Sequence, residues 1–248
     1  MEKYFLKCEK DWSGSQINEE IFAWAYLENE GKEYLGSYGD YNFYDHSRLI
    51  GLLNLPLTYR EKPAEWENHR RINTELYFGK DPNNFVNEEF LESLRNRCTN
   101  IYTDYKNTFP KISIHIRRGD VNKNNYPKRY ISNQYFLDHI VKIREVSPNA
   151  RILIFSESVS DEGFDEFEKL GCELKLDCDL EFTWTELINS DVLIMSIGSF
   201  SYIPAMYNKG FVIFYPAWYK KISHWNDNDD SDLYKNLKNF LNSKYEHL

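Results

Sequence analysis

The sequence predicts an α/β fold with a parallel sheet that helices cover on both faces. From Lys111 onward, short apolar segments alternate strictly with segments whose apolar residues recur at helical spacing. The apolar segments are nearly continuous, as expected for strands that are buried on both faces. Strands and helices that alternate in this way are typical of parallel strands joined by helical crossovers.

Composition is that of a globular chain and argues against two classes of partner. The 248 residues are 42% hydrophobic and 17% aromatic, which is enough for a sizeable core. The formal net charge of −9 argues against a nucleic-acid or an anionic-membrane partner. We find neither a signal peptide nor a segment able to span a bilayer, and therefore expect a cytoplasmic protein without a transmembrane segment.

The cysteines indicate neither a metal site nor a disulfide framework. The chain contains no Cys-x-x-Cys, and no histidine lies at metal-ligand spacing from Cys8, Cys98, Cys172 or Cys178. We expect reduced thiols, most of them in the core.

Residues 1–109 are expected to form an N-terminal domain. The predicted elements are a strand over Tyr4–Cys8, a helix with Asn18 as N-cap, a helix over Ser47–Leu53 and a helix from Asn87 to about Tyr105. Phe109-Pro110 ends the last helix, because a residue before proline disfavours helical backbone. We place the domain boundary there.

Residues 110–225 are expected to form a second domain. Strands are predicted over Lys111–Ile116, Arg151–Phe155, Cys172–Leu176, Asp191–Met195 and Phe211–Tyr215, with a helix in each interval. Residues 226–248 follow, with a helix from Asp232 to about Tyr245 that carries an apolar stripe. We expect this helix to pack back on the N-terminal domain, since other helices already cover the second sheet.

The segment Lys111–Asp120 is the centre of the predicted site. Its isoleucines alternate with polar residues, a pattern typical of a strand with one buried face, and it continues into Arg117-Arg118-Gly119-Asp120. Ligands of open α/β sheets bind at the carboxyl ends of the strands, and arginine forks match phosphate oxygens. The segment therefore predicts an anion site, with a surface turn paired through Asp120 as the alternative.

A second stretch, Ser190–Asn208, predicts the other half of that site. A strand ends near Ser196, and a helix begins at Ser199 or Ser201, with Pro204 in its first turn. Exposed amides and hydroxyls at a helix N-terminus form an anion site, although the serines could also serve only as caps. Two such sites on neighbouring strands fit a pyrophosphate between them.

These residues resemble a known family. His115-Ile-Arg-Arg-Gly-Asp120, Ser196-x-x-Ser-Phe-Ser201, Ala205-x-x-Asn208 and Pro216-Ala-Trp218 are similar to motifs of the α1,2-fucosyltransferases, and His-x-Arg-Arg is shared with α1,6- and protein O-fucosyltransferases. The resemblance covers about Ile112 to Trp218. It implies a GT-B-like enzyme of two Rossmann-like domains, in which residues 1–109 would lie on the acceptor side and residues 110–225 would bind the nucleotide sugar. The reaction would invert the configuration at the transferred sugar and need no metal or other cofactor. Such an enzyme moves fucose from GDP-fucose to a sugar hydroxyl of a glycan acceptor.

The resemblance also implies roles for individual residues. Arg117 would bind the β-phosphate and stabilise the departing diphosphate, and His115 would contact the nucleoside. The other expected substrate contacts are Arg118, Asp177, Ser199, Phe200 and Ser201. Asp120 is the nearest candidate for the catalytic base, with bracing of Arg118 as its alternative role. Asp11, Glu19, Glu20 and Asp40 are further base candidates in the first domain.

Two features leave alternatives open. Asp177-Cys-Asp179 has the spacing of a metal-binding pair, but we interpret it as a loop before a helix. Asp11-Trp-Ser-Gly-Ser-Gln16 stands where the family usually has Gly-Gly-x-Gly-Asn-Gln. The alternatives are therefore transfer of another sugar from a GDP or UDP donor, and a non-catalytic protein that binds a nucleotide or a glycan. The sequence predicts neither the acceptor nor the oligomeric state.

Overall fold

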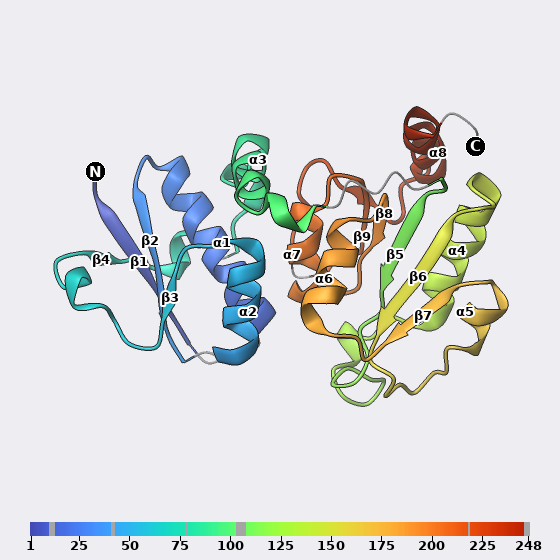
Figure 1. Cartoon of the computed structure of the whole chain (residues 1–248), viewed down its shortest axis with the longest axis horizontal. Helices are drawn as coiled ribbons and strands as arrows, with labels where there is room; N and C mark the ends of the chain where they lie inside the picture. The colour runs from blue at the N-terminus through green and yellow to red at the C-terminus, as the bar shows by residue number, and fades with distance from the viewer. Residues whose placement is uncertain (10–12, 41–42, 78, 103–107, 218, 246–248) are drawn as a thin grey trace. The chain divides into compact units, whose positions relative to one another are not determined.

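The structure is a computed structural model that describes the chain except residues 10–12, 41–42, 78, 103–107, 218 and 246–248, and except the side chains of residues 13, 43 and 44. It divides into two compact units, Met1–Ile101 and Tyr102–Leu248, so the division falls before the predicted boundary at residue 110. Each unit has its own parallel sheet with helices packed against it (Figure 1). The predicted α/β fold class with two Rossmann-like domains is confirmed.

The first unit contains a four-stranded sheet in the order β3-β2-β1-β4, in which each neighbouring pair is parallel. Its strands are β1 (Lys3–Cys8), β2 (Glu33–Gly39), β3 (Thr58–Tyr59) and β4 (Arg70–Arg71). Its helices are α1 (Ser13–Asn29), α2 (Phe43–Leu53) and α3 (Glu88–Arg97), with short 3₁₀ segments at Ala64–Trp66, Thr74–Leu76, Pro82–Asn84 and Thr99–Ile101.

Two helix boundaries in the first unit differ from those predicted. Helix α1 begins at Ser13, so Asn18 is not an N-cap but lies buried inside the helix. Asn87 does cap α3, because its Oδ1 atom accepts a hydrogen bond from the Phe90 amide at 2.9 Å. Helix α3 ends at Arg97 and not near residue 105, which lies outside the described residues.

The second unit contains a six-stranded sheet in the order β10-β9-β8-β5-β6-β7, again parallel at every pair. Its strands are β5 (Lys111–His115), β6 (Arg151–Ser156), β7 (Glu173–Leu176), β8 (Val192–Ile194), β9 (Phe211–Phe214) and β10 (Asn226–Asp227). Its helices are α4 (Asn133–Val146), α5 (Asp165–Lys169), α6 (Leu180–Ile188), α7 (Ser199–Tyr207) and α8 (Leu233–Lys244), with a 3₁₀ segment at Pro127–Arg129. The short polar strand β10 was not predicted, because it has no apolar pattern.

Strand β5 lies in the middle of this sheet and is buried along its whole length. Ile112 and Ile114 belong to the core on the side of α4 and α8. On the opposite side, the Ser113 hydroxyl donates to the Glu186 carbonyl oxygen of α6 at 3.2 Å. The prediction of one buried face is therefore wrong: the polar positions are covered as well, since helix α6 supplies a hydrogen-bond partner.

The order of strands reverses next to β5. The chain runs from β5 to β6 and β7 on one side and then crosses to β8 on the other side. Open α/β sheets bind ligands outside the carboxyl ends of their strands at such a reversal. The point between β5 and β8 is therefore the place where the fold itself favours a ligand.

Helix α8 does not pack as predicted. Its apolar stripe, Leu233, Leu237 and Leu241, is buried in the core of the second unit, together with residues of α4 and the sheet. The Tyr245 hydroxyl also donates to Asp191 at 2.7 Å, which anchors the end of the helix. The expectation that the helix packs on the N-terminal domain is wrong, because the short helix α5 leaves part of this sheet face for α8 to cover.

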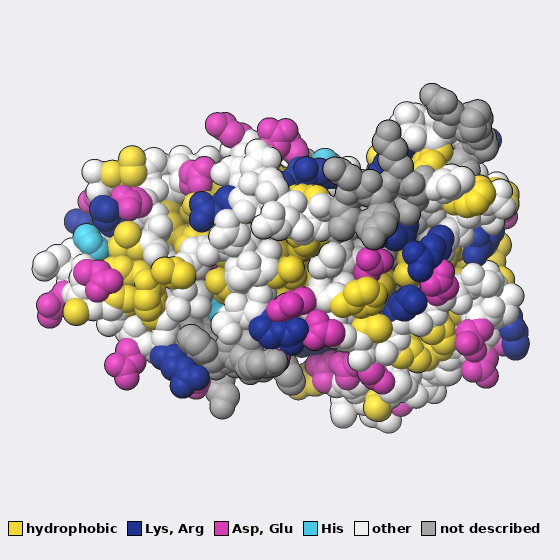
Figure 2. All heavy atoms as spheres, viewed as in Figure 1, with side chains coloured by type: hydrophobic (Ala, Val, Ile, Leu, Met, Phe, Trp, Pro, Cys, Tyr) yellow, Lys and Arg dark blue, Asp and Glu magenta, His cyan; other side chains and the backbone are white. Residues whose placement is uncertain are grey.

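Charges are mixed on the face of the second unit that Figure 2 shows, where Lys and Arg side chains are interspersed with Asp and Glu. Among the described residues, no helix combines the length and the apolar character that crossing a membrane requires.

Candidate functional site

Four neighbouring strands of the second sheet bring polar side chains to one edge. Ser196 follows β8, Arg117 follows β5, Glu157 follows β6 and Asp177 follows β7. Because these parallel strands are neighbours in the order β8-β5-β6-β7, the four residues follow the same order along the carboxyl edge. Ser196 and Arg117 flank the reversal of strand order.

Arg117 connects the two halves of the predicted anion site. Its backbone amide donates to the Ser196 hydroxyl at 3.2 Å, so the loops after β5 and β8 are joined. Its guanidinium holds Asp120 through two contacts, Nη2 to Oδ2 at 2.8 Å and Nε to Oδ1 at 3.3 Å. Only 17% of the Arg117 side chain is exposed, so the fork is held in one orientation but remains open to a ligand.

Gly198 brings the N-terminus of α7 against that guanidinium. A Cβ atom on Gly198 would lie only 2.6 Å from the Arg117 Nη1 atom, and the glycine has φ of 136°, which other residues rarely adopt. Gly198 also occupies the N-cap position of α7, where the amides of the first turn and the helix dipole favour an anion. A guanidinium and a helix N-terminus therefore meet at one point.

The two predicted serines of α7 differ in their positions. Ser199 is the first residue of the helix and is partly exposed, so its hydroxyl stays a candidate for contact with a phosphate. Ser201 is fully buried, and its hydroxyl donates to the Ser196 carbonyl oxygen at 2.9 Å. This corrects the expectation for Ser201, which stabilises the turn instead. Pro204 lies inside α7 and not in its first turn, because the helix begins at Ser199.

Arg118 was expected to contact the substrate, with a salt bridge to Asp120 as the alternative role of that carboxylate, and the structure corrects both. Its side chain is 1% exposed, and Asp120 pairs with Arg117 instead. One Arg118 nitrogen donates to the Arg117 carbonyl oxygen at 2.9 Å, and another donates to Asn133 Oδ1. The guanidinium also lies over the Tyr130 ring. Burial lowers the pKa of Arg118, and these partners hold the buried charge in place.

His115 is buried beside the anion site and is uncharged at neutral pH. Burial, followed by the charges of Arg117 and Arg118, lowers the pKa of His115 to about 3. Its ring lies 4.8 Å from that of Phe200, which in turn contacts Trp184 at 5.8 Å between ring centroids. The His115 Nδ1 atom has no hydrogen-bond partner within the described part of the chain. A ligand at this edge could provide the missing partner.

Glu157 is a site residue that the sequence reasoning missed. Its carboxylate lies against Gly119, where a Cβ atom would be 1.9 Å from Oε2, and Gly119 has φ of 71°. Burial raises the pKa of Glu157, and the nearby Asp120 and Asp177 raise it further, whereas Arg117 opposes the shift. The signal that could have found it is its position directly after the strand that begins at Arg151.

The Asp177-Cys-Asp179 segment is a loop before a helix, as predicted. Asp179 is the N-cap of α6, and its Oδ1 atom accepts hydrogen bonds from the Glu181 and Phe182 amides at 3.0 and 3.3 Å. Asp177 is exposed at the sheet edge, where hydrogen bonds from the side chain and the backbone amide of Ser158 lower its pKa. Within the described residues, no group of three or more His, Cys, Asp or Glu is arranged to hold a metal ion.

Comparison with known proteins finds similarity only among solved structures. No family model matches the sequence, and no curated protein matches it either. A structure of POFUT1 in complex with GDP shares 8% identity over 84% of this chain and 96% of its own, with a TM-score of 0.45. A structure of the E. coli heptosyltransferase WaaC with ADP-2-deoxy-2-fluoro heptose shares 7% sequence identity with this chain. The match covers 97% of this chain and 99% of the heptosyltransferase chain, with a TM-score of 0.48. The catalytic domain of starch synthase IV from Arabidopsis thaliana, bound to ADP and acarbose, shares 15% sequence identity with this chain. The match covers 65% of this chain and 36% of the starch synthase chain, with a TM-score of 0.36.

The sheet edge of the second unit is electrostatically divided. The Arg117 guanidinium and the N-terminus of α7 make the end near β8 attractive to anions. Asp120 pairs with Arg117, whereas Glu157 and Asp177 make the end near β6 and β7 acidic. This arrangement suits a ligand with a charged diphosphate at one end and hydroxyl groups at the other, because carboxylates accept hydrogen bonds from hydroxyl groups.

Of the residues singled out in the first unit, Gln16 and Glu20 have structural partners. Gln16 donates from Nε2 to the carbonyl oxygens of Glu9 at 2.9 Å and Asp40 at 3.0 Å, so it ties the segment after β1 to the segment after β2. Glu20 is buried, with its Oε1 atom 3.0 Å from His46 Nε2. Glu19 is partly exposed and Asp40 exposed, while residue 11 is not described.

Proposed function

We propose that this protein is a glycosyltransferase that moves fucose from GDP-fucose to a hydroxyl group of a glycan, with inversion and without a metal ion. The observation that carries the proposal is the contact between the Arg117 guanidinium and Gly198 at the N-terminus of α7. It supports a diphosphate site at the reversal of strand order, which is the position that an open α/β sheet favours for a nucleotide.

The chemistry follows from the charge of the leaving group. Cleavage of the bond between the sugar and the diphosphate leaves additional negative charge on the β-phosphate. A fixed guanidinium and the amides of a helix N-terminus stabilise this charge as it grows, because they are already oriented towards it. In this proposal Asp120 keeps the Arg117 fork oriented, and the Ser199 hydroxyl adds a further donor.

The nucleoside would lie beside the buried ring of His115. The unpaired Nδ1 atom of His115 supports this placement, since a nucleoside hydroxyl or base atom would supply its hydrogen bond. Phe200, whose ring contacts His115, would add an apolar surface for the same group. The hydroxyl groups of the donor would then extend towards Asp177 and Glu157.

Glu157 fits the role of the base better than Asp120 does. Both oxygens of Asp120 already accept hydrogen bonds from the Arg117 guanidinium, so its carboxylate is engaged in orienting that side chain. Burial and two neighbouring carboxylates raise the pKa of Glu157, which brings it closer to the pH at which a base is most effective. Glu157 is also exposed to solvent at the edge, where an acceptor hydroxyl could reach it.

A second candidate function is nucleotide binding without catalysis. The pairing of Asp120 with Arg117 favours it, because the carboxylate that lies closest to the anion site is already occupied. Transfer of a different sugar from a GDP or UDP donor remains the alternative among enzymes.

Isothermal titration with GDP, UDP and GDP-fucose, combined with a donor-hydrolysis assay, separates these functions. We expect GDP and GDP-fucose to bind, UDP to bind more weakly, and GDP-fucose to be hydrolysed slowly in the absence of acceptor. Binding without any turnover, also in the presence of glycan acceptors, would favour the non-catalytic protein. Preference for UDP would show that the donor is another nucleotide sugar.

A further inference from the structure

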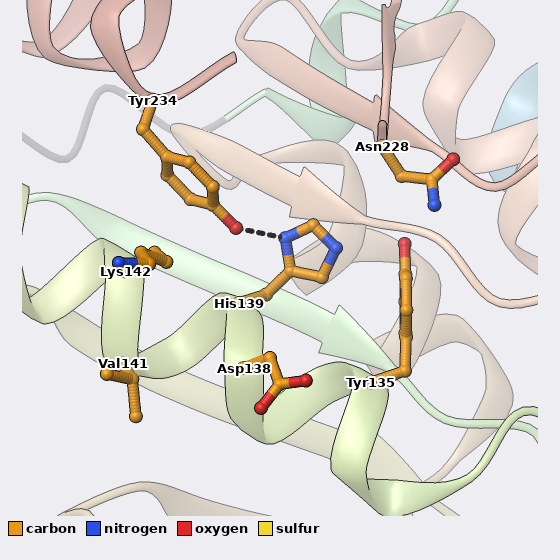
Figure 3. A pocket seen from close by; sticks show the side chains of 7 residues that line it. All are labelled: Tyr135, Asp138, His139, Val141, Lys142, Asn228 and Tyr234. Atoms are coloured by element: carbon orange, nitrogen blue, oxygen red, sulfur yellow. Dashed lines mark hydrogen bonds between the residues drawn. The ribbon is translucent and has the colours of Figure 1, made fainter. Parts of the chain in front are cut away.

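A cavity lies between helices α4 and α8 of the second unit, apart from the residues of the donor site. Its volume is about 540 Å³, within the range of sites for small molecules. Tyr135 and His139 of α4, Tyr234 of α8 and Asn228 from the segment before α8 line it (Figure 3). None of these residues has a role in the proposed transfer reaction.

The inner wall of the cavity contains an uncharged polar pair. The Tyr234 hydroxyl lies 2.7 Å from the Nδ1 atom of His139, as the dashed line in Figure 3 shows. Burial lowers the pKa of His139 to about 4 and raises the pKa of Tyr234 to about 12. Both groups are therefore neutral at physiological pH.

A further polar atom at the cavity, the Oδ1 atom of Asn228, is buried without a hydrogen-bond partner among the described residues. The Tyr135 hydroxyl, in contrast, interacts with the side chain of Asn228 itself. In Figure 3 the Tyr135 hydroxyl points towards the Asn228 side chain, and the second ring nitrogen of His139 is directed to the same side. Buried polar atoms are rarely left unsatisfied, so the partner of Asn228 Oδ1 comes from outside the described residues, as a ligand or as ordered water.

The charged side chains of the cavity are exposed at its rim and already have partners. Asp138 Oδ1 accepts a hydrogen bond from Gln134 Nε2 at 2.7 Å. Lys142 Nζ lies 3.3 Å from Glu145 Oε2. The polar atoms that remain for a ligand, on Tyr135, His139 and Asn228, are all neutral, which favours a ligand without charge.

Aromatic rings complete the chemical character of the cavity. The rings of Tyr135 and His139 meet edge to face with centroids 4.6 Å apart, and the Tyr234 ring lies 6.0 Å from that of His139. Ring faces pack against apolar C–H groups, while hydroxyl, amide and imidazole groups exchange hydrogen bonds with hydroxyls. We propose that this cavity is a second carbohydrate site, which binds one pyranose unit of a neutral glycan.

Saturation-transfer NMR on the full chain tests this site, with the methyl glycosides of β-D-galactose, β-D-glucose and α-L-fucose as separate probes. We expect at least one glycoside to bind saturably, with a Kd on the order of 1 mM, as for a small ligand with few contacts. Tyr135→Phe keeps the ring but removes the hydroxyl that faces Asn228, and should weaken binding roughly fivefold to tenfold. Tyr126→Phe is the matched control, since Tyr126 is exposed and lies outside the cavity, and it should bind as the wild type does.

Three results would overturn the proposal. One is that none of the glycosides binds, which leaves ordered water as the partner of the buried polar atoms. Another is that Tyr135→Phe and Asn228→Ala, with unchanged circular dichroism, both bind the glycoside as tightly as the wild type. The last is that glycerol, which has hydroxyls but no ring, competes at the same concentration.

The variant Arg117→Ala separates this site from the donor site. We expect it to lose affinity for GDP but to keep the glycoside affinity of the wild type, because the cavity shares no residue with the anion site. Loss of glycoside binding in folded Arg117→Ala protein would place the sugar at the donor site and overturn the proposal. A failure of GDP to bind any form of the protein concerns the proposed function alone.

Discussion

The Nη1 atom of Arg117 lies 2.6 Å from the position that a Cβ atom of residue 198 would occupy, so only glycine fits there without displacing the guanidinium. The loop after β5 and the N-terminus of α7 are therefore matched to each other, although about 80 residues separate them in the sequence.

Gly198→Ala should weaken GDP binding by at least about tenfold, because the added methyl group moves the Arg117 fork away from the helix N-terminus. The melting temperature should also fall, since φ of 136° is unfavourable for alanine. Gly51→Ala is the control: Gly51 lies in α2 with open space around it, so alanine should be neutral or slightly stabilising there. Equal GDP affinity in both variants, by isothermal titration, would contradict a role of this contact in binding.

Arg117→Ala should lower kcat for donor hydrolysis and transfer by roughly 10²–10³, since it removes one preorganised group that stabilises a developing charge. Affinity for GDP should fall less, by about tenfold, because the stabilisation is larger in the transition state than in the bound donor. Arg117→Lys should restore little, since one ammonium cannot replace the two-pronged contact. Near-normal turnover of the alanine variant would show that this strand end is not the active site.

Arg118→Ala should reduce the stability of the protein more than its affinity for GDP. The buried guanidinium holds the Arg117 carbonyl oxygen and Asn133 Oδ1, and both lose their partner in the variant. We expect the free energy of unfolding to fall by roughly 3 kcal/mol, as for other broken buried charge networks. Urea denaturation measures this loss. A variant as stable as the wild type that no longer binds GDP would mean that Arg118, and not Arg117, contacts the phosphate.

Glu157→Gln should lower turnover and at the same time raise stability at neutral pH. The pKa of Glu157 is raised in the folded protein, so the unfolded state binds fewer protons between the two pKa values and wild-type stability falls as the pH rises through them. Glutamine removes this destabilisation, so the melting temperature of the Glu157→Gln variant should exceed that of the wild type at pH 7. The two melting temperatures should converge below about pH 4, where the Glu157 carboxyl of the wild type is protonated in both the folded and the unfolded state. A lower melting temperature of the variant at pH 7, or unchanged turnover, would contradict the assignment.

Donor binding and turnover should be insensitive to EDTA, because in the proposed function a guanidinium and helix amides neutralise the diphosphate. The test is the hydrolysis rate of GDP-fucose before and after chelation. If chelation abolished turnover and Mn²⁺ restored it, Asp177 would be a metal ligand, and the proposed mechanism would have to be replaced.

Local patterns in the sequence were sufficient to predict the alternation of strands and helices after Lys111. They were also sufficient to place Arg117 after one strand and a helix start near Ser199. Both are features of periodicity and of residues at the ends of elements, which depend on neighbours along the chain. That these two positions lie next to each other depends on the strand order, in which β8 pairs with β5.

The tertiary structure decided which partner each polar side chain has. Asp120 is close in sequence to both Arg117 and Arg118, and only the turn around Gly119 directs it to Arg117. Glu157 belongs to the site because β6 pairs with β5, a contact between residues about 40 positions apart. Neither relation has a local signature in the sequence.

Helix α8 shows the same division between local pattern and tertiary packing. The sequence by itself determined an amphipathic helix near the C-terminus, because the spacing of Leu233, Leu237 and Leu241 forms an apolar stripe. The surface that buries the stripe was decided by tertiary structure, which left part of the sheet face beside α4 uncovered. Apolar burial has no direction of its own, so a stripe specifies that it is buried but not against which surface.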